Sequence, residues 1–246
     1  MPPSDDWSAS PAQPILTPHE VHVWRAHLDC SDLVLRRLEA ALSPEEIARA
    51  NRFFFLRDRQ HFIAARGILR QLLAEYLRRS PVDLEFAYHS RGKPYLVSPT
   101  VTPVAFNVSH SRGLALLAFS PGRELGADLE FIRPEIASDE IASRYFAPSE
   151  VAELQSLSPA QRPEAFFLCW TRKEAYIKAR GEGLQIPLTS FRVSLTPGQP
   201  EILESADASR WTLRNLSPAP DYAAALVAEG HDWQLRTFDW QLAKPL

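Results

Sequence analysis

Two acidic residues two positions apart could bind a metal ion. The segment Gly126–Glu130 reads Gly-Ala-Asp-Leu-Glu. On a β-strand, residues two apart point to the same face, so Asp128 and Glu130 would lie side by side, about 7 Å apart. Such carboxylates repel each other unless a cation lies between them, and hard oxygen ligands favour Mg²⁺. Gly126 shares their face and would leave room for a ligand. The alternative is a solvent-facing strand that carries two acids.

A second pair could supply a base and a cation. Glu174 and Lys178 lie four residues apart in a segment with helical periodicity, at the border of its apolar stripe. A carboxylate close to a metal could serve as a third ligand or accept a proton, and a lysine one turn later could neutralise a phosphate. The alternative is an i,i+4 ion pair on the surface.

Ser109 and His110 are a third candidate, in Phe-Asn-Val-Ser-His-Ser-Arg-Gly. They occur where a strand enters a turn of small polar residues. A lone histidine is more often structural, and neither a Ser-His-Asp order nor a nucleophile elbow accompanies it, so we do not expect a serine hydrolase.

Basic residues gather upstream of these motifs. Eight arginines fall between Arg49 and Arg79, and Arg91 and Lys93 follow in a loop. A solvated helix face is the ordinary explanation. A phosphate-rich ligand or an acidic protein partner is the alternative.

The elements that must position these residues follow from periodicity and turn residues. A capping serine and a proline at Ser43-Pro44 predict a helix start. A helix is predicted over 58–77, and another over 164–179 that Gly181 and Gly183 stop. Pro121-Gly122 predicts a hairpin-like turn. Strands are predicted over 21–28, 84–88, 106–109, 114–119, 125–131, 191–195, 211–216 and 222–228.

Each half of the chain therefore has helices followed by a run of strands. This order predicts an α+β protein with two similar halves related by pseudo-twofold symmetry and a ligand cleft at the seam. The predicted boundaries are a disordered lead-in over 1–18, an N-terminal half over 19–122 and a C-terminal half over 123–246.

Composition excludes several classes of protein. The 246 residues are 45% hydrophobic and 23% charged, with a net charge of −3. That balance argues against a nucleic-acid binder, and no apolar run reaches the length of a membrane helix. The only cysteines, Cys30 and Cys169, form no metal or disulfide framework, so we expect a reduced, cytoplasmic protein in which Cys169 is a buried thiol.

The order of the motifs is more specific than any one of them. Arg-Gly-Lys-Pro, Phe-Asn-Val-Ser-His-Ser, Gly-Ala-Asp-Leu-Glu and Trp-Thr-Arg-Lys-Glu-Ala-Tyr-Ile-Lys-Ala-Arg-Gly-Glu-Gly-Leu follow one another. Together they resemble the 4′-phosphopantetheinyl transferase superfamily. The chain length and its two halves are similar to the monomeric surfactin-synthetase-activating type and unlike the short trimeric acyl-carrier-protein synthase. The resemblance spans residues 43–184.

This resemblance implies a Mg²⁺-dependent transfer from coenzyme A. Coenzyme A would lie between the halves, with its diphosphate on a Mg²⁺ ion held by Asp128, Glu130 and Glu174. Glu174 would deprotonate a serine of an apo acyl- or peptidyl-carrier protein, directly or through water. The hydroxyl would attack the β-phosphate and displace adenosine 3′,5′-bisphosphate, whose α-phosphate Lys178 would stabilise.

The resemblance also implies how coenzyme A is held. Ser109 and His110 would contact the phosphates, with His110 in the catalytic set, and the 3′-phosphate and adenine end would bind Arg49, Arg91 and Lys93. The chain departs from the family pattern at Glu46, where a lysine can occur, and Arg66 or Arg91 could compensate.

The sequence does not specify the carrier protein, and it leaves two alternative functions open. The carrier could serve fatty-acid or secondary-metabolite biosynthesis, and acyl-coenzyme A should be tolerated because the thiol end projects away from the diphosphate. Two other functions remain open, a Mg²⁺-dependent nucleotide or diphosphate hydrolase and a non-catalytic carrier-binding homologue.

Overall fold

The structure is a computed structural model that describes residues 6–11, 13–90, 92–97, 103–181, 186–196, 198 and 200–242. In the N-terminal half the elements are β1 (Ser8–Ala9), β2 (Glu20–His27), α1 (Asp32–Glu39), α2 (Pro44–Ala50), α3 (Leu56–Leu77), η1 (Pro81–Asp83), β3 (Phe86–Tyr88), β4 (Pro94–Leu96), β5 (Val104–Ser111) and β6 (Leu114–Pro121). They continue with β7 (Leu125–Phe131), α4 (Asp139–Tyr145), α5 (Pro148–Ser156), α6 (Arg162–Arg180), η3 (Leu188–Ser190), β8 (Arg192–Val193), β9 (Ile202–Glu204), η4 (Ala208–Arg210), β10 (Trp211–Leu216), β11 (Tyr222–Glu229) and β12 (Gln234–Asp239).

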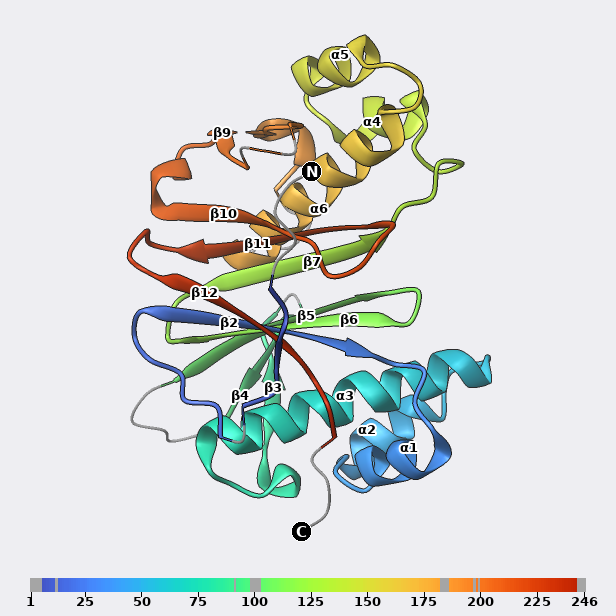
Figure 1. The fold of residues 1–246 in the computed structure, drawn as a ribbon, viewed down its shortest axis with the longest axis vertical. Helices are drawn as coiled ribbons and strands as arrows, with labels where there is room; N and C mark the ends of the chain where they lie inside the picture. The colour runs from blue at the N-terminus through green and yellow to red at the C-terminus, as the bar shows by residue number, and fades with distance from the viewer. Residues whose placement is uncertain are drawn as a thin grey trace.

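Two sheets pack face to face between two long helices, in four layers (Figure 1). One sheet has the strand order β1-β12-β2-β6-β5 and the other β10-β11-β7. Helix α3 covers the outer face of the first sheet, and α6 covers the outer face of the second. The fold is therefore α+β, as predicted.

This layering explains why β6 is apolar throughout. Its residues 114, 116 and 118 face the second sheet, whereas residues 115, 117 and 119 face α3. With both faces buried, the strand shows no alternation of polar and apolar residues. The same holds for β11, which lies between the first sheet and α6.

The predicted helix boundaries are close to those observed. Ser43 caps α2, as predicted, and the structure adds that Glu46 completes a capping box with it. Helix α6 ends at Gly181, whose φ of 68° is the left-handed conformation that glycine adopts readily. Gly183 lies outside the described residues.

Three predictions about chain organisation need correction. Pro121-Gly122 does not close a hairpin, because β6 belongs to the first sheet and β7 to the second. The lead-in is ordered in part, since Ser8–Ala9 forms β1 and the Trp7 indole donates to the Ser217 carbonyl at 3.0 Å. Strand β12, assigned to the C-terminal half, pairs in parallel with β2 in the first sheet.

The prediction that Cys169 is a buried thiol is confirmed. Cys30 and Cys169 are both free thiols, and Cys169 is buried. Within the described ranges, no helix combines the length and apolar character needed to cross a membrane.

Candidate active site

The edges of the two sheets meet where β5 runs beside β7. Each is the last strand of its sheet, so β7 presents backbone N–H groups that no strand pairs. Side chains of β5 accept them: Asn107 Oδ1 from Ala127 N at 2.9 Å, Ser109 Oγ from Leu129 N at 3.3 Å, and Ser111 Oγ from Phe131 N at 3.2 Å. Polar residues at every second position of β5 thus join the two sheets.

The same two serines hold the acidic pair of β7. Ser109 Oγ donates to Asp128 Oδ1 and Ser111 Oγ to Glu130 Oε2, each at 2.9 Å. Asp128 is buried and Glu130 half-buried. The solvent-facing alternative for this strand is therefore excluded for Asp128.

Gly126 serves the approach of a helix, which corrects the expectation that it leaves room for a ligand. A Cβ atom at this position would collide with the backbone of Ala175 and Ala179 in α6. Only glycine lets α6 come so close to β7. This close approach brings the side chains of α6 onto the acidic pair two and four residues further along β7.

Glu174 and Lys178 project from α6 beside that pair. The Lys178 Nζ atom donates to Asp128 Oδ1 at 2.6 Å, and lies 3.3 Å from both Ser109 Oγ and the Ala127 carbonyl oxygen. Lys178 is thus ion-paired across the helix–strand contact, and the alternative of a surface pair with Glu174 does not hold. Among the described residues, no hydrogen bond involves the Glu174 carboxylate.

A buried lysine next to Glu174 fixes how α6 lies. Lys173 is fully buried and its Nζ atom is 2.8 Å from Glu150 Oε2, 2.8 Å from the Leu188 carbonyl and 2.6 Å from the Phe191 carbonyl. Removing one partner of such a buried pair is strongly destabilising. The pair therefore ties α6 to α5 and η3.

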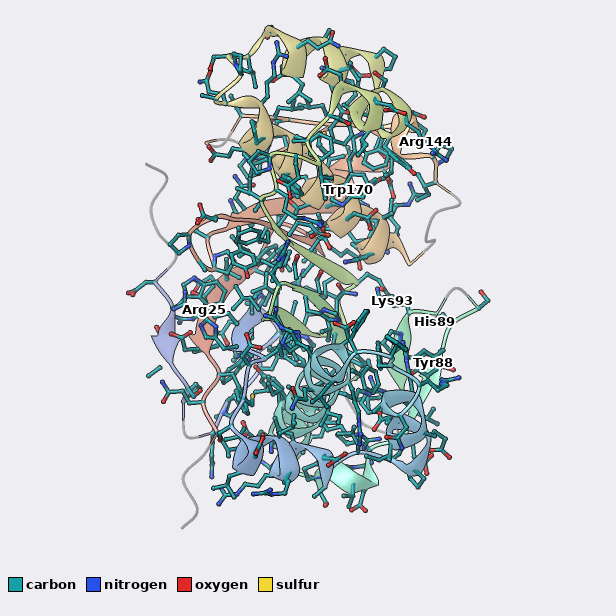
Figure 2. The ribbon with its side chains drawn as sticks, turned by 90° about the vertical axis from the view of Figure 1, so that its right-hand side faces the viewer. Arg25, Tyr88, His89, Lys93, Arg144 and Trp170 are labelled. Carbon is teal, nitrogen blue, oxygen red and sulfur yellow. The ribbon has the colours of Figure 1, made fainter. Side chains whose placement is uncertain are left out.

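The acidic pair of β7, Ser109, Glu174 and Lys178 line one cleft of about 590 Å³ at the seam. Its walls come from both halves, as predicted for the ligand site. It is lined by Val108, Ser109, His110, Asp128, Glu130, Tyr145, Trp170, Glu174, Lys178 and Leu188. Figure 2 looks onto this side of the molecule, with Trp170 above the seam and Lys93 below it.

Electrostatics in the cleft favours a bound cation. Burial, followed by the charge of Asp128, raises the pKa of Glu174. Burial also raises the pKa of Glu130; Asp128 adds to this effect and the Ser111 hydrogen bond opposes it. The second oxygen of Asp128, Oδ2, is buried and has no hydrogen-bond partner. Three crowded carboxylates with one unsatisfied oxygen fit the ligand chemistry of Mg²⁺.

The carboxylates do not converge on one point in this conformation. In the part of the chain that the structure describes, no group of three or more Asp, Glu, His or Cys side chains has the arrangement of a metal site. Lys178 is hydrogen-bonded to Oδ1 of Asp128, which leaves Oδ2 as the oxygen still available.

His110 lies on the cleft wall with an exposed side chain. Desolvation by the neighbouring protein atoms is the largest effect that lowers the pKa of His110. The charges of His61 and Lys178 lower this pKa further. A neutral imidazole at this position can both donate and accept a hydrogen bond.

Two other predicted coenzyme A ligands, Lys93 and Arg49, are not among the residues that line the cleft. Lys93 pairs with Glu124 at 3.1 Å, donates to the Leu125 carbonyl at 3.2 Å and passes beside Gly181 at the end of α6. Arg49 is exposed on α2, with its guanidinium 5.2 Å from the Phe62 ring centroid. Arg91 lies outside the described residues.

Glu46, the departure from the family pattern, has a structural role. Its carboxylate is buried, pairs with Arg66 and pairs with Arg70 at 2.6 Å, while accepting from Ser43 N at 2.9 Å. Arg66 also stacks 3.8 Å over the Phe86 ring, and its Nη2 atom is buried without a hydrogen-bond partner. Arg66 therefore keeps one unused donor despite its pairing with Glu46.

Sequence reasoning missed residues that join β5 to β7 and residues that line the cleft. Asn107 and Ser111 are polar at the same two-residue spacing as Ser109, and this period could have identified them. Tyr145, Trp170 and Leu188 gave no such signal, because their place in the cleft depends on how α4, α6 and η3 pack.

Comparisons with known proteins identify the family of this chain. The family model "4′-phosphopantetheinyl transferase superfamily" matches residues 124–227, and the model "4′-phosphopantetheinyl transferase, N-terminal" matches residues 29–122. The two matches meet at the turn between β6 and β7.

Relatives with the same description cover nearly the whole chain. The 4′-phosphopantetheinyl transferase HetI of Nostoc sp. is 42% identical over 93% of this chain and 95% of its own length. The 4′-phosphopantetheinyl transferase Sfp of Bacillus subtilis is 28% identical over 80% of this chain and 86% of its own. Among solved structures, the Thermotoga maritima holo-[acyl-carrier-protein] synthase matches with a TM-score of 0.36 and 23% identity, over 43% of this chain and 62% of that chain.

The family assignment rests on the sequence matches. The chain belongs to the 4′-phosphopantetheinyl transferase superfamily and is an enzyme of the transferase class.

Proposed function

We propose that this enzyme transfers the 4′-phosphopantetheine group of coenzyme A to a serine of an apo acyl- or peptidyl-carrier protein, with Glu174 and Lys178 as its catalytic pair. The observation that carries the proposal is the cleft between the sheets, where an acid and a lysine of one helix face two further acids of β7. Transfer from a diphosphate needs positive charge to neutralise the phosphates, and it needs a base to deprotonate the attacking hydroxyl.

Glu174 accepts the serine proton. Its pKa is raised by burial and by Asp128, which makes it a stronger base than a solvent-exposed glutamate. The serine oxygen forms a bond to the β-phosphorus as the bond to the bridging oxygen breaks. Adenosine 3′,5′-bisphosphate leaves with that electron pair.

Lys178 stabilises the leaving group. Its ammonium is already in the cleft, where hydrogen bonds to Ser109 Oγ and Asp128 Oδ1 orient it. A positioned cation at the oxygen that gains charge lowers the barrier because no solvent has to reorganise.

Asp128, Glu130 and Glu174 would hold a Mg²⁺ ion. The ion would supply charge neutralisation for the diphosphate. The unpartnered Oδ2 of Asp128 and the raised pKa values of the two glutamates support this assignment.

Coenzyme A binding extends from the cleft across the first half of the chain. Ser109 and His110 contact the phosphates, His110 as a neutral imidazole that can donate a hydrogen bond. The 3′-phosphate and adenine end are bound by Arg49, Arg91 and Lys93. Arg66 would compensate for Glu46 only after a side-chain movement, because its unpartnered Nη2 atom is buried. We also propose that the enzyme works as a monomer in the cytoplasm and accepts acyl-coenzyme A.

Release of adenosine 3′,5′-bisphosphate tests the proposal. It should require Mg²⁺, coenzyme A and an apo-carrier together, and should stop when the carrier serine is changed to alanine. Release without a carrier would instead identify a hydrolase. Coenzyme A binding with no release, across several carriers, would identify a non-catalytic homologue.

A further inference from the structure

Four consecutive large apolar side chains are exposed between α2 and α3. Phe53, Phe54, Phe55 and Leu56 are 39%, 92%, 64% and 66% exposed, and we refer to them as the aromatic patch. Single exposed apolar residues are common on protein surfaces, whereas a contiguous group marks an interaction site.

The aromatic patch is held in place by the two helices beside it. Phe53 N donates to the Ala50 carbonyl at 3.3 Å, at the end of α2, and the Phe53 ring packs on Phe62 with centroids 5.4 Å apart. Phe54 and Phe55 then pack edge to face, 5.0 Å apart, and point away from the core. Rigid aromatic side chains lose little conformational entropy on binding, which makes them effective anchors.

The patch lies close to the mouth of the catalytic cleft. His61, in the second turn of α3, bonds Asp29 at 2.8 Å. Both side chains border Gly113 in the β5–β6 turn, three residues after the cleft residue His110. Figure 1 shows the start of α3 and the β5–β6 turn on the same side of the molecule.

Positive charge surrounds the patch. Between positions 49 and 59 there are four arginines and one acid, in a chain whose net charge is −3. Arg57 pairs with Asp29 at 3.4 Å and Arg59 with Glu39 at 3.4 Å. Arg49 and Arg52 are exposed and have no acidic partner among the described residues. A partner that fits this surface carries negative charge around an apolar contact.

We infer that the aromatic patch, flanked by Arg52, is the surface on which an acidic carrier protein docks to present its serine to Glu174. The inference rests on the proposed function, because only a protein substrate needs a surface beside the cleft. Phe54 and Phe55 provide the apolar anchors, and Arg52 steers the acidic partner toward the cleft mouth, whereas Arg49 is assigned to coenzyme A.

Steady-state kinetics of a double variant, Phe54→Ser with Phe55→Ser, tests the inference. Both side chains are exposed, so the fold should be kept, and the melting temperature checks this. We expect the KM for the apo-carrier to rise about tenfold or more, as for loss of a binding anchor. The KM for coenzyme A and the kcat at saturating carrier should stay at the wild-type values.

Val82→Ser is the matched control. Val82 is 58% exposed in η1, which follows the other end of α3, and its replacement should leave the carrier KM unchanged. Arg52→Glu should raise the carrier KM, and the difference from wild type should shrink at high salt.

Each outcome separates the docking surface from the proposed function. If wild type modifies the carrier and the double variant has an unchanged carrier KM, the docking surface is wrong while the function stands. If wild type binds coenzyme A but modifies no carrier, the proposed function fails and takes the docking surface with it. If sedimentation shows that wild type self-associates and the double variant does not, the patch is an interface between copies of this chain, which overturns the inference.

Discussion

The pKa of Glu174 is raised, first by burial and then by the charge of the neighbouring Asp128. Its carboxylate is therefore protonated at a higher pH than that of a solvent-exposed glutamate. The proposed role of Glu174 as the base requires the ionised form, so kcat/KM should fall as the pH decreases through this raised pKa. A bound cation favours the ionised form and should move that acid limb to lower pH.

Rate profiles at two Mg²⁺ concentrations measure this shift directly. The Glu174→Gln variant should lose the acid limb, together with about 10²–10⁴-fold in kcat. An acid limb that is insensitive to Mg²⁺ would contradict the placement of the ion beside Glu174.

The same raised pKa has an effect on stability. A carboxyl whose pKa is higher in the folded state stabilises the protein below its unfolded pKa, and that stabilisation is lost as the pH rises through the folded value. Without Mg²⁺ at neutral pH, Glu174→Gln should thus melt at a higher temperature than wild type. A lower melting temperature would show that Glu174 makes favourable contacts in the metal-free protein.

Lys178 holds the buried carboxylate of Asp128 when no ligand is bound. Lys178→Ala should lower kcat by about 10²–10³-fold, as for loss of one stabilising donor. It should also lower the free energy of unfolding by about 1–3 kcal/mol, because a buried carboxylate loses its partner. Chemical denaturation with and without Mg²⁺ checks this, since the ion should recover part of the loss. Lys178→Arg is the control that keeps the charge, and equal losses in both variants would argue against the charge as the cause.

At the scale of single residues, the ordered motifs predicted the group that lines the cleft. Spacing placed Asp128 beside Glu130 and Glu174 beside Lys178, but could not show which residues pair across the helix–strand contact. Gly126 was misinterpreted for the same reason, because its neighbour is a helix from 50 residues further along the chain. The pairing of Glu46 with Arg66 and Arg70 could not be predicted either, because the two arginines lie on the next helix, α3.

Among the elements, α6 and β7 decide the geometry of the site. Replacing Gly126 by alanine forces a Cβ into the backbone of α6, which must then move away from β7. We expect a loss of stability of about 1–3 kcal/mol or more, and a loss of kcat because Glu174 and Lys178 move with the helix.

Gly198→Ala is the control for this substitution. A Cβ at Gly198 meets no atom within 4 Å, so stability should change by less than about 0.5 kcal/mol. Thermal unfolding and single-turnover transfer measure both effects. Wild-type turnover by Gly126→Ala would mean that the close contact of α6 and β7 does not position the catalytic pair.

Helix caps and apolar runs predicted most of these elements. The capping box at Ser43 and the stop at Gly181 act locally, within one turn, and could therefore be read from sequence. The assignment of strands to sheets could not. Strands β6 and β7 are neighbours in sequence and suggested a hairpin, yet β7 leaves its neighbour to pair with β11.

In the whole molecule, the chain crosses the seam twice. It passes from the first sheet to the second after β6, and β12 returns to pair with β2. Phe238 of β12 lies 4.8 Å from the Trp24 ring and 5.2 Å from the His22 ring. The sequence boundary at 122/123 is thus not a boundary between two independent folding units.

Deleting residues 234–242 should therefore destabilise the N-terminal half, although the deleted strand follows the C-terminal half in sequence. The deletion exposes the edge of β2 and removes the Phe238 ring, which packs on Trp24. Phe238→Ala keeps the strand and should cost less, roughly 1–3 kcal/mol. Thermal unfolding followed by tryptophan fluorescence compares the two. A deletion that melts as wild type would show that the sheets fold separately.

The central claim is that the seam cleft transfers phosphopantetheine to a carrier serine with Glu174 as the base. Intact-mass spectrometry of an apo-carrier, incubated with the enzyme, coenzyme A and Mg²⁺, tests it most directly. The account predicts that the carrier gains the mass of one phosphopantetheine group, and that the gain disappears with EDTA and with Glu174→Gln. An unmodified carrier in the complete mixture, or full modification by Glu174→Gln, would contradict it.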